Sequence, residues 1–154
     1  MKITDIITGS RPSLSFEVFP PKNWDTYDSI CTATEKLAGL NPSYMSVTYG
    51  AGGGTTHYTV SIASNLQDRF DVPVIAHLTC ISSSKDEVRG QLDKLRQAGI
   101  RNILALRGDM PKDAKASPPI TNTPLSSLRT SVQRVSSAWA VPVILRDTPK
   151  AAHG

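Results

Sequence analysis

The chain has 154 residues, 39% of them hydrophobic, which suffices for one globular domain with a buried core. Residues 1–113 carry 12 basic and 12 acidic side chains, so the net charge of +4 arises in the remainder and indicates no nucleic-acid surface. No apolar run approaches the roughly 20 residues that span a bilayer, and no secretory signal is found, so we expect a cytoplasmic protein without a membrane partner. Two cysteines are too few for a disulfide framework, so we expect both to be reduced.

Four strand-like segments recur in the first 113 residues at the spacing of a βα unit. They begin near Leu14, Tyr44, Pro73 and Asn102, at intervals of 30, 29 and 29 residues. Consecutive βα units predict an α/β fold with a parallel sheet and right-handed crossovers. Such a sheet is either doubly wound or part of a (β/α)8 barrel, and the spacing does not choose between them.

Helical patterns lie between these strands. Apolar residues share one helix face at Tyr27, Ile30, Cys31, Leu37 and Ala38, and another at Val88, Leu92 and Leu95. Ser84 and Glu87 predict a capping box at the start of the later helix, and Gly99 predicts its end.

A glutamate lies near the end of the first predicted strand. In parallel α/β sheets and barrels, ligands meet the C-terminal ends of strands, so polar residues there are candidates for a site. Glu17 stands between Phe16 and Phe19, before two prolines that end the strand. A carboxyl group enclosed by aromatic rings favours its protonated form, as a general acid requires. The alternative is a glutamate that caps a helix or forms a salt bridge.

The second predicted strand ends at Thr48 and Tyr49 and runs into a glycine-rich turn at residues 50–55. Glycines allow a ligand to approach the backbone closely, and N–H groups ahead of a helix suit an anion such as phosphate. The turn matches neither the Walker pattern nor the dinucleotide fingerprint, so a merely flexible turn is the alternative.

His77 lies in the third predicted strand and could donate a hydrogen bond to a cofactor. A lone histidine in a strand is, however, more often a core residue. With Cys80 it offers too few ligands for zinc, and we expect no metal site.

The fourth predicted strand ends in Arg107, Gly108 and Asp109, which place a cation, a glycine and a carboxylate in one turn. A structural ion pair between Arg107 and Asp109 is the alternative to a ligand-binding role.

In this order, the four strand ends resemble the signatures of the methylenetetrahydrofolate reductase family. These are Phe-Glu-x-Phe-Pro-Pro-Lys, Val-Thr-Tyr-Gly-Ala-Gly-Gly, Ala-His-Leu-Thr-Cys and Asn-Ile-Leu-Ala-Leu-Arg-Gly-Asp, all found between Phe16 and Asp109. The resemblance covers about residues 10–113. It implies a partial (β/α)8 TIM barrel comprising the first four to five βα units, because a whole barrel typically needs about 250 residues.

The resemblance also implies an activity. In this family NADH or NADPH reduces bound FAD, which then reduces 5,10-methylenetetrahydrofolate to 5-methyltetrahydrofolate, a step of one-carbon metabolism that serves methionine biosynthesis. The parent enzyme is expected to be a homo-oligomer.

The resemblance assigns roles to particular residues. Glu17 matches the general acid that protonates the folate N5, and Asp109 matches a carboxylate near flavin and folate. The positions that match flavin contacts are Thr48, Tyr49, Ala51, His77, Arg107, Gly108 and Asp109. Thr48 is also expected near the nicotinamide.

Residues 114–154 differ in character from residues 1–113. They contain five basic side chains and the single acid Asp147, and they are rich in serine and proline. One interpretation is a mobile tail with a short strand at Ala140 to Leu145. The other is a frameshifted translation that begins between about Asp113 and Pro118. Back-translated and read in one shifted frame, residues 119–124 can spell His-Tyr-Lys-Tyr-Ala, and residues 143–150 can spell Gly-Tyr-Pro-Glu-Gly-His-Pro-Glu. These phrases resemble the family's continuation of the barrel. An open continuation of the barrel in the shifted frame of the gene is the expected result.

Two other functions stay open on the sequence alone. The first is a non-catalytic barrel fragment. The second is a barrel enzyme that uses the turn at residues 50–55 for a phosphate substrate.

Overall fold

A computed structural model describes residues 1–49, 56–79, 85–106 and 143–146. The strands are β1 (Ser15–Val18), β2 (Tyr44–Val47), β3 (Val74–Thr79), β4 (Asn102–Leu106) and β5 (Val143–Arg146). The helices are α1 (Ile3–Ile7), the 3-10 turn η1 (Trp24–Thr26), α2 (Tyr27–Ala38), α3 (Thr56–Phe70) and α4 (Lys85–Gln97). The four predicted strands therefore begin within one residue of the expected positions.

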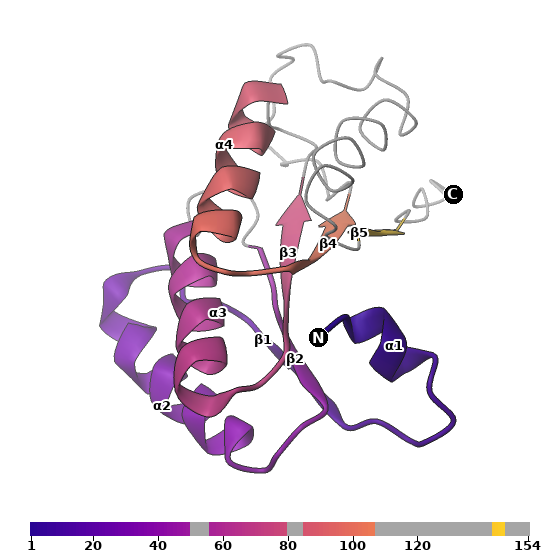
Figure 1. Ribbon diagram of the computed structural model, residues 1–154. Coiled ribbons are helices and arrows are strands. Elements are labelled where there is room, and N and C mark those ends of the chain that lie inside the picture. Colours follow the sequence, from indigo (N-terminus) through magenta and orange to yellow (C-terminus); the bar gives the residue numbers. More distant parts are fainter. Residues whose placement is uncertain (50–55, 80–84, 107–142, 147–154) are drawn as a thin grey trace, which may run out of the picture.

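All five strands form one parallel sheet in the order β1-β2-β3-β4-β5. A doubly wound sheet reverses its strand order at a switch point, whereas a (β/α)8 barrel adds each strand next to the previous one. Figure 1 shows α2, α3 and α4 together on one side of the sheet, and α1 on the other. The sequential order and the one-sided helical layer favour the barrel of the two predicted alternatives.

The hydrophobic core lies between the sheet and these three helices. Alternate strand residues face it, and the strand members of the core are Val18, Met45, Val47, Val74, Ala76, Leu78 and Ile103. From α3 and α4 it receives Ile62, Ala63, Leu66, Val88, Leu92 and Leu95. The intervening strand residues, Glu17, Ser46, Ile75 and His77 among them, consequently lie on the opposite face, here called the inner face.

Each of the three long helices is followed by one residue with positive φ before the next strand. These residues are Asn41 (φ 54°), Asp71 (φ 52°) and Gly99 (φ 71°). After α4, the amide of Gly99 donates to the Arg96 carbonyl and that of Ile100 to the Leu95 carbonyl, at 2.9 Å each. Gly99 thus ends the α4 helix as predicted, because glycine adopts left-handed backbone angles without strain. Ser84 of the predicted capping box lies outside the described residues.

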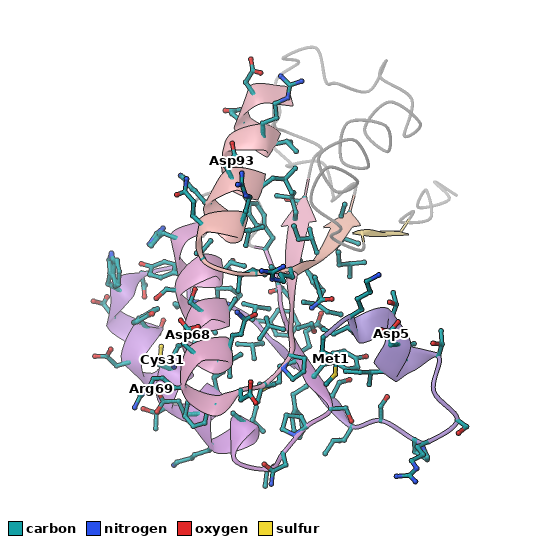
Figure 2. The ribbon with its side chains drawn as sticks, viewed as in Figure 1. Met1, Asp5, Cys31, Asp68, Arg69 and Asp93 are labelled. Atoms are coloured by element: carbon teal, nitrogen blue, oxygen red, sulfur yellow. The ribbon has the colours of Figure 1, made fainter. Side chains whose placement is uncertain are left out.

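The α2 and α3 helices are joined by polar contacts on their outer side. Arg69, labelled in Figure 2, lies 3.1 Å from Glu35 Oε1, which also accepts a hydrogen bond of 3.1 Å from the Asn65 side-chain amide. Because Arg69 is 66% exposed, this pair orients the helices but adds little stability.

Helix α1 was not predicted, and it is tied to the N-terminal ends of β3 and β4. Asn102, at the start of β4, accepts a 3.1 Å hydrogen bond from the Ile3 amide through Oδ1. Its Nδ2 donates to the carbonyls of Val74 and Met1 at 3.3 and 3.4 Å. Ile3 is 1% exposed. The opposite, C-terminal ends of the strands are therefore the ends at which a ligand site is expected.

Candidate active site

Three of the predicted site residues are described at the C-terminal ends of neighbouring strands. Glu17 is the third residue of β1, Thr48 follows the last residue of β2, and His77 is the fourth residue of β3. Glu17 is in register with Ser46, and Ser46 with Ile75, two residues before His77. Barrel strands are tilted, so side chains of alternate strands with such an offset share one layer of the interior.

The contact between β1 and β3 is a close approach of Glu17 and His77. The Nε2 atom of His77 lies 3.8 Å from Oε1 of Glu17, which exceeds hydrogen-bond distance. The side chain of His77 is 10% exposed, whereas that of Glu17 is 48% exposed. One nearly buried imidazole thus lies beside one accessible carboxylate on the inner face.

The protonation of His77 is set by its burial. Burial lowers the pKa of His77 below its ordinary value of 6.5, and the nearby Glu17 charge opposes this shift. Since burial is the larger cause, His77 is uncharged near neutral pH. A neutral imidazole presents one donor and one acceptor, which suits it to hydrogen-bond a neutral heterocycle.

The expected enclosure of Glu17 between aromatic rings is wrong. Phe16 packs against the core on the helical side, because adjacent strand residues point to opposite faces. Phe19 is 66% exposed, and the side chain of Glu17 is itself 48% exposed. The close neighbour of Glu17 is His77, which is uncharged near neutral pH, so this contact is not a salt bridge under those conditions.

The end of β2 is held on both sides. The amide of Thr48 donates a 2.8 Å hydrogen bond to the Val18 carbonyl, and the Thr48 carbonyl accepts a 3.0 Å bond from the Thr59 hydroxyl. Tyr49 is 9% exposed and belongs to the core. Its side chain therefore faces the helices, which leaves its backbone as the group that could meet a ligand.

Four predicted site residues, Ala51, Arg107, Gly108 and Asp109, lie outside the described residues, as do the turn at residues 50–55 and Cys80. The structure consequently brings together Glu17, Thr48 and His77 only. Within the described ranges, no group of three His, Cys, Asp or Glu side chains could hold a metal ion. None of the described helices is long and apolar enough to cross a membrane.

Sequence reasoning missed two residues at the site, Ser46 and Thr59. Ser46 is half-buried on the inner face beside Glu17. The alternation of β2, with Met45 and Val47 in the core, was a signal for it. Thr59 had no such signal, because its bond to Thr48 joins residues that only the fold brings together.

Comparisons with known proteins agree on one family. The family model described as methylenetetrahydrofolate reductase matches residues 2–141. A 5,10-methylenetetrahydrofolate reductase from Pectobacterium carotovorum subsp. carotovorum is 38% identical over 103 residues, 67% of this chain and 35% of that protein. Methylenetetrahydrofolate reductase (NADH) 1 from Arabidopsis thaliana is 36% identical over 110 residues, 71% of this chain and 19% of that protein.

Among solved structures, N-acetylneuraminate lyase from Fusobacterium nucleatum superposes with a TM-score of 0.59 at 13% identity. The likeness covers 95% of this chain and 49% of that chain. At this identity it shows the fold alone, and it confirms the predicted partial (β/α)8 barrel.

Proposed function

The chain belongs to the methylenetetrahydrofolate reductase family, and from that premise we propose that it forms part of an enzyme that reduces 5,10-methylenetetrahydrofolate with electrons from NAD(P)H through FAD. The chain spans about a third of the length of the bacterial relative and about a fifth of the plant relative. The activity is accordingly proposed for the whole enzyme, a cytoplasmic homo-oligomer. The name of the plant relative favours NADH as the reductant.

The observation that carries the proposal is the pairing of Glu17 with a nearly buried His77 on the inner face, with Thr48 ending the strand between them. The family signatures around all three residues lie at strand ends, where barrel enzymes bind their ligands.

The chemistry of these side chains fits a flavin. The isoalloxazine ring is planar and needs hydrogen-bond partners along a polar edge, and bound FAD would supply hydride acceptance and donation. Neutral His77 offers one donor and one acceptor without placing a charge beside the ring. Thr48, half-buried and continuing the inner-face alternation of β2, adds a hydroxyl. The residues Ala51, Arg107, Gly108 and Asp109 are proposed to complete the cofactor site.

Glu17 is proposed as the general acid for the folate. Its carboxyl group is accessible from the inner face, and an uncharged His77 does not hold it in a permanent ion pair. In the complete enzyme this carboxyl group is proposed to give a proton to the folate N5, which opens the methylene bridge. Asp109, which follows β4 in the sequence, is proposed to hold the folate.

The substitution Glu17→Gln in the complete enzyme tests this role, because it keeps the shape of the side chain and removes the acid. Stopped-flow absorbance of the flavin should show reduction by NADH at a rate close to that of the wild type. Reoxidation by 5,10-methylenetetrahydrofolate should fall at least about 100-fold, the usual contribution of a positioned acid. Equal loss of both half-reactions would contradict the assignment.

A further inference from the structure

The hydroxyl of Thr59 forms a tertiary hydrogen bond to the end of β2. Buried threonines in helices commonly bond the carbonyl four residues earlier, as Thr34 does to Ile30 at 2.7 Å. Thr59, which is 1% exposed on α3, donates to the carbonyl of Thr48 at 3.0 Å. The bond joins the first turns of α3 to the end of β2, across the segment that contains the glycine-rich turn.

Two successive hydrogen bonds connect α3 to β1 through Thr48, and the bond from Thr59 is the first of them. The amide of Thr48 donates to the Val18 carbonyl at 2.8 Å, and Val18 directly follows Glu17. Tyr49, next to Thr48, is 9% exposed, and Tyr58, next to Thr59, is 3% exposed. Both neighbours of this bond are therefore packed in the protein interior. Trp24 packs edge-on against Tyr58, with ring centroids 4.8 Å apart. The position of Thr48 is consequently fixed from α3 as well as from β1.

We propose that Thr59 is a positioning residue for the site. Its hydroxyl holds the Thr48 carbonyl and thereby orients the end of β2 that presents Thr48. Because the Thr48 amide bonds the Val18 carbonyl, the same contact also orients β1, which carries Glu17. This inference rests on the proposed function, because Thr48 and Glu17 acquire their roles there. Removing the hydroxyl leaves a part-buried carbonyl without this donor, so the peptide is expected to rotate or to bind water.

The test uses the full 154-residue chain with FAD as the probe. Thr59→Val keeps the shape of the side chain and removes the donor, whereas Thr59→Ser keeps the donor. Thr34→Val is the matched control, since Thr34 is equally a buried helical threonine (3% exposed) that bonds only within α2 among the described contacts. The readouts are the FAD dissociation constant, from flavin fluorescence, and the hydrogen-exchange rate of the Thr48 amide.

Thr59→Val should weaken FAD binding about tenfold and speed exchange of the Thr48 amide. Thr59→Ser and Thr34→Val should leave both readouts close to the wild type. Unchanged readouts in Thr59→Val, or equal losses in Thr59→Val and Thr34→Val, would overturn the inference while the proposed function stands. A folded wild-type chain that binds no FAD would overturn the proposal that these strand ends bind flavin, and this inference with it.

If Thr59→Val does not fold, the variants Thr59→Ser and Thr59→Cys provide a second comparison. Ser and Cys have nearly the same shape, but a thiol is a weak donor. Thr59→Ser should therefore bind FAD more tightly than Thr59→Cys, and equal affinities would overturn the inference.

Discussion

His77 experiences two influences on its protonation that act in opposite directions. Burial lowers its pKa, and the carboxylate of Glu17, 3.8 Å away, raises it by a smaller amount. The folded protein therefore binds a proton at this site less readily than the unfolded chain does. Well above pH 6.5 both states are neutral, and the site adds no pH dependence to stability.

Acidification therefore destabilises the folded protein through His77. As the pH falls below 6.5, the unfolded chain takes up a proton that the folded chain refuses, so the free energy of unfolding decreases until the pH reaches the lowered pKa of His77. We predict that the urea midpoint of the wild type drops between about pH 8 and about pH 5. His77→Gln should show a smaller drop.

His57→Gln is the control for this measurement, because His57 is exposed on α3. It should retain the pH dependence of the wild type. If His77→Gln and the wild type lose stability in parallel, burial does not govern the protonation of His77.

The outcome for Glu17 shows a limit of sequence reasoning at the residue scale. The motif located the residue at the end of a strand, as observed, but adjacency to Phe16 and Phe19 was taken as enclosure. Strand neighbours face opposite sides of the sheet, and Phe16 accordingly packs in the core. Enclosure of a side chain depends on elements distant in sequence, which no local pattern contains.

At the scale of elements, the end of α4 depends on one glycine. Gly99 has a φ of 71°, and a Cβ atom added there would lie 3.3 Å from the Nε2 atom of Gln67. We predict that Gly99→Ala lowers the free energy of unfolding by about 1 kcal/mol or more, because a left-handed conformation strains any residue with a Cβ. Urea denaturation followed by circular dichroism measures the change.

Gly90 provides the matched control on the same helix. It lies inside α4, and an added Cβ would meet nothing within 4 Å. Gly90→Ala should therefore raise the free energy of unfolding by about 0.5–1 kcal/mol, since alanine favours helix. A stabilising Gly99→Ala, or two variants of the same sign, would contradict this account of the helix end.

The strands were predictable because each combines a short apolar run with the regular spacing of βα units. Helix α1 was not, because five residues carry no periodic signal and its position depends on the bonds between Asn102 and Ile3. The last strand was expected at Ala140 to Leu145, and β5 occupies Val143–Arg146. Its pairing with β4 sets these bounds, and a single sequence shows only its apolar composition.

At the scale of the whole molecule, the sheet presents a helix-covered face and an inner face with polar side chains. Residues 1–113 are proposed as the N-terminal part of the reductase barrel, and the frameshifted origin of residues 114–154 stays a prediction. The family model matches through residue 141, and β5 pairs with β4, so an in-frame continuation is the competing expectation. Neither alternative alters the arrangement of Glu17, Thr48 and His77, which are contributed by β1 to β3.

The central claim is that the inner face at the C-terminal ends of these strands binds flavin. The most direct measurement is an NMR titration of the 154-residue chain with FAD, in which the imidazole resonances are observed and that of His77 is assigned through His77→Gln. The account predicts that FAD shifts the His77 resonance progressively and leaves that of the exposed His57 in place. A His77 resonance unmoved by FAD at saturating flavin, or a shift confined to His57, would contradict it.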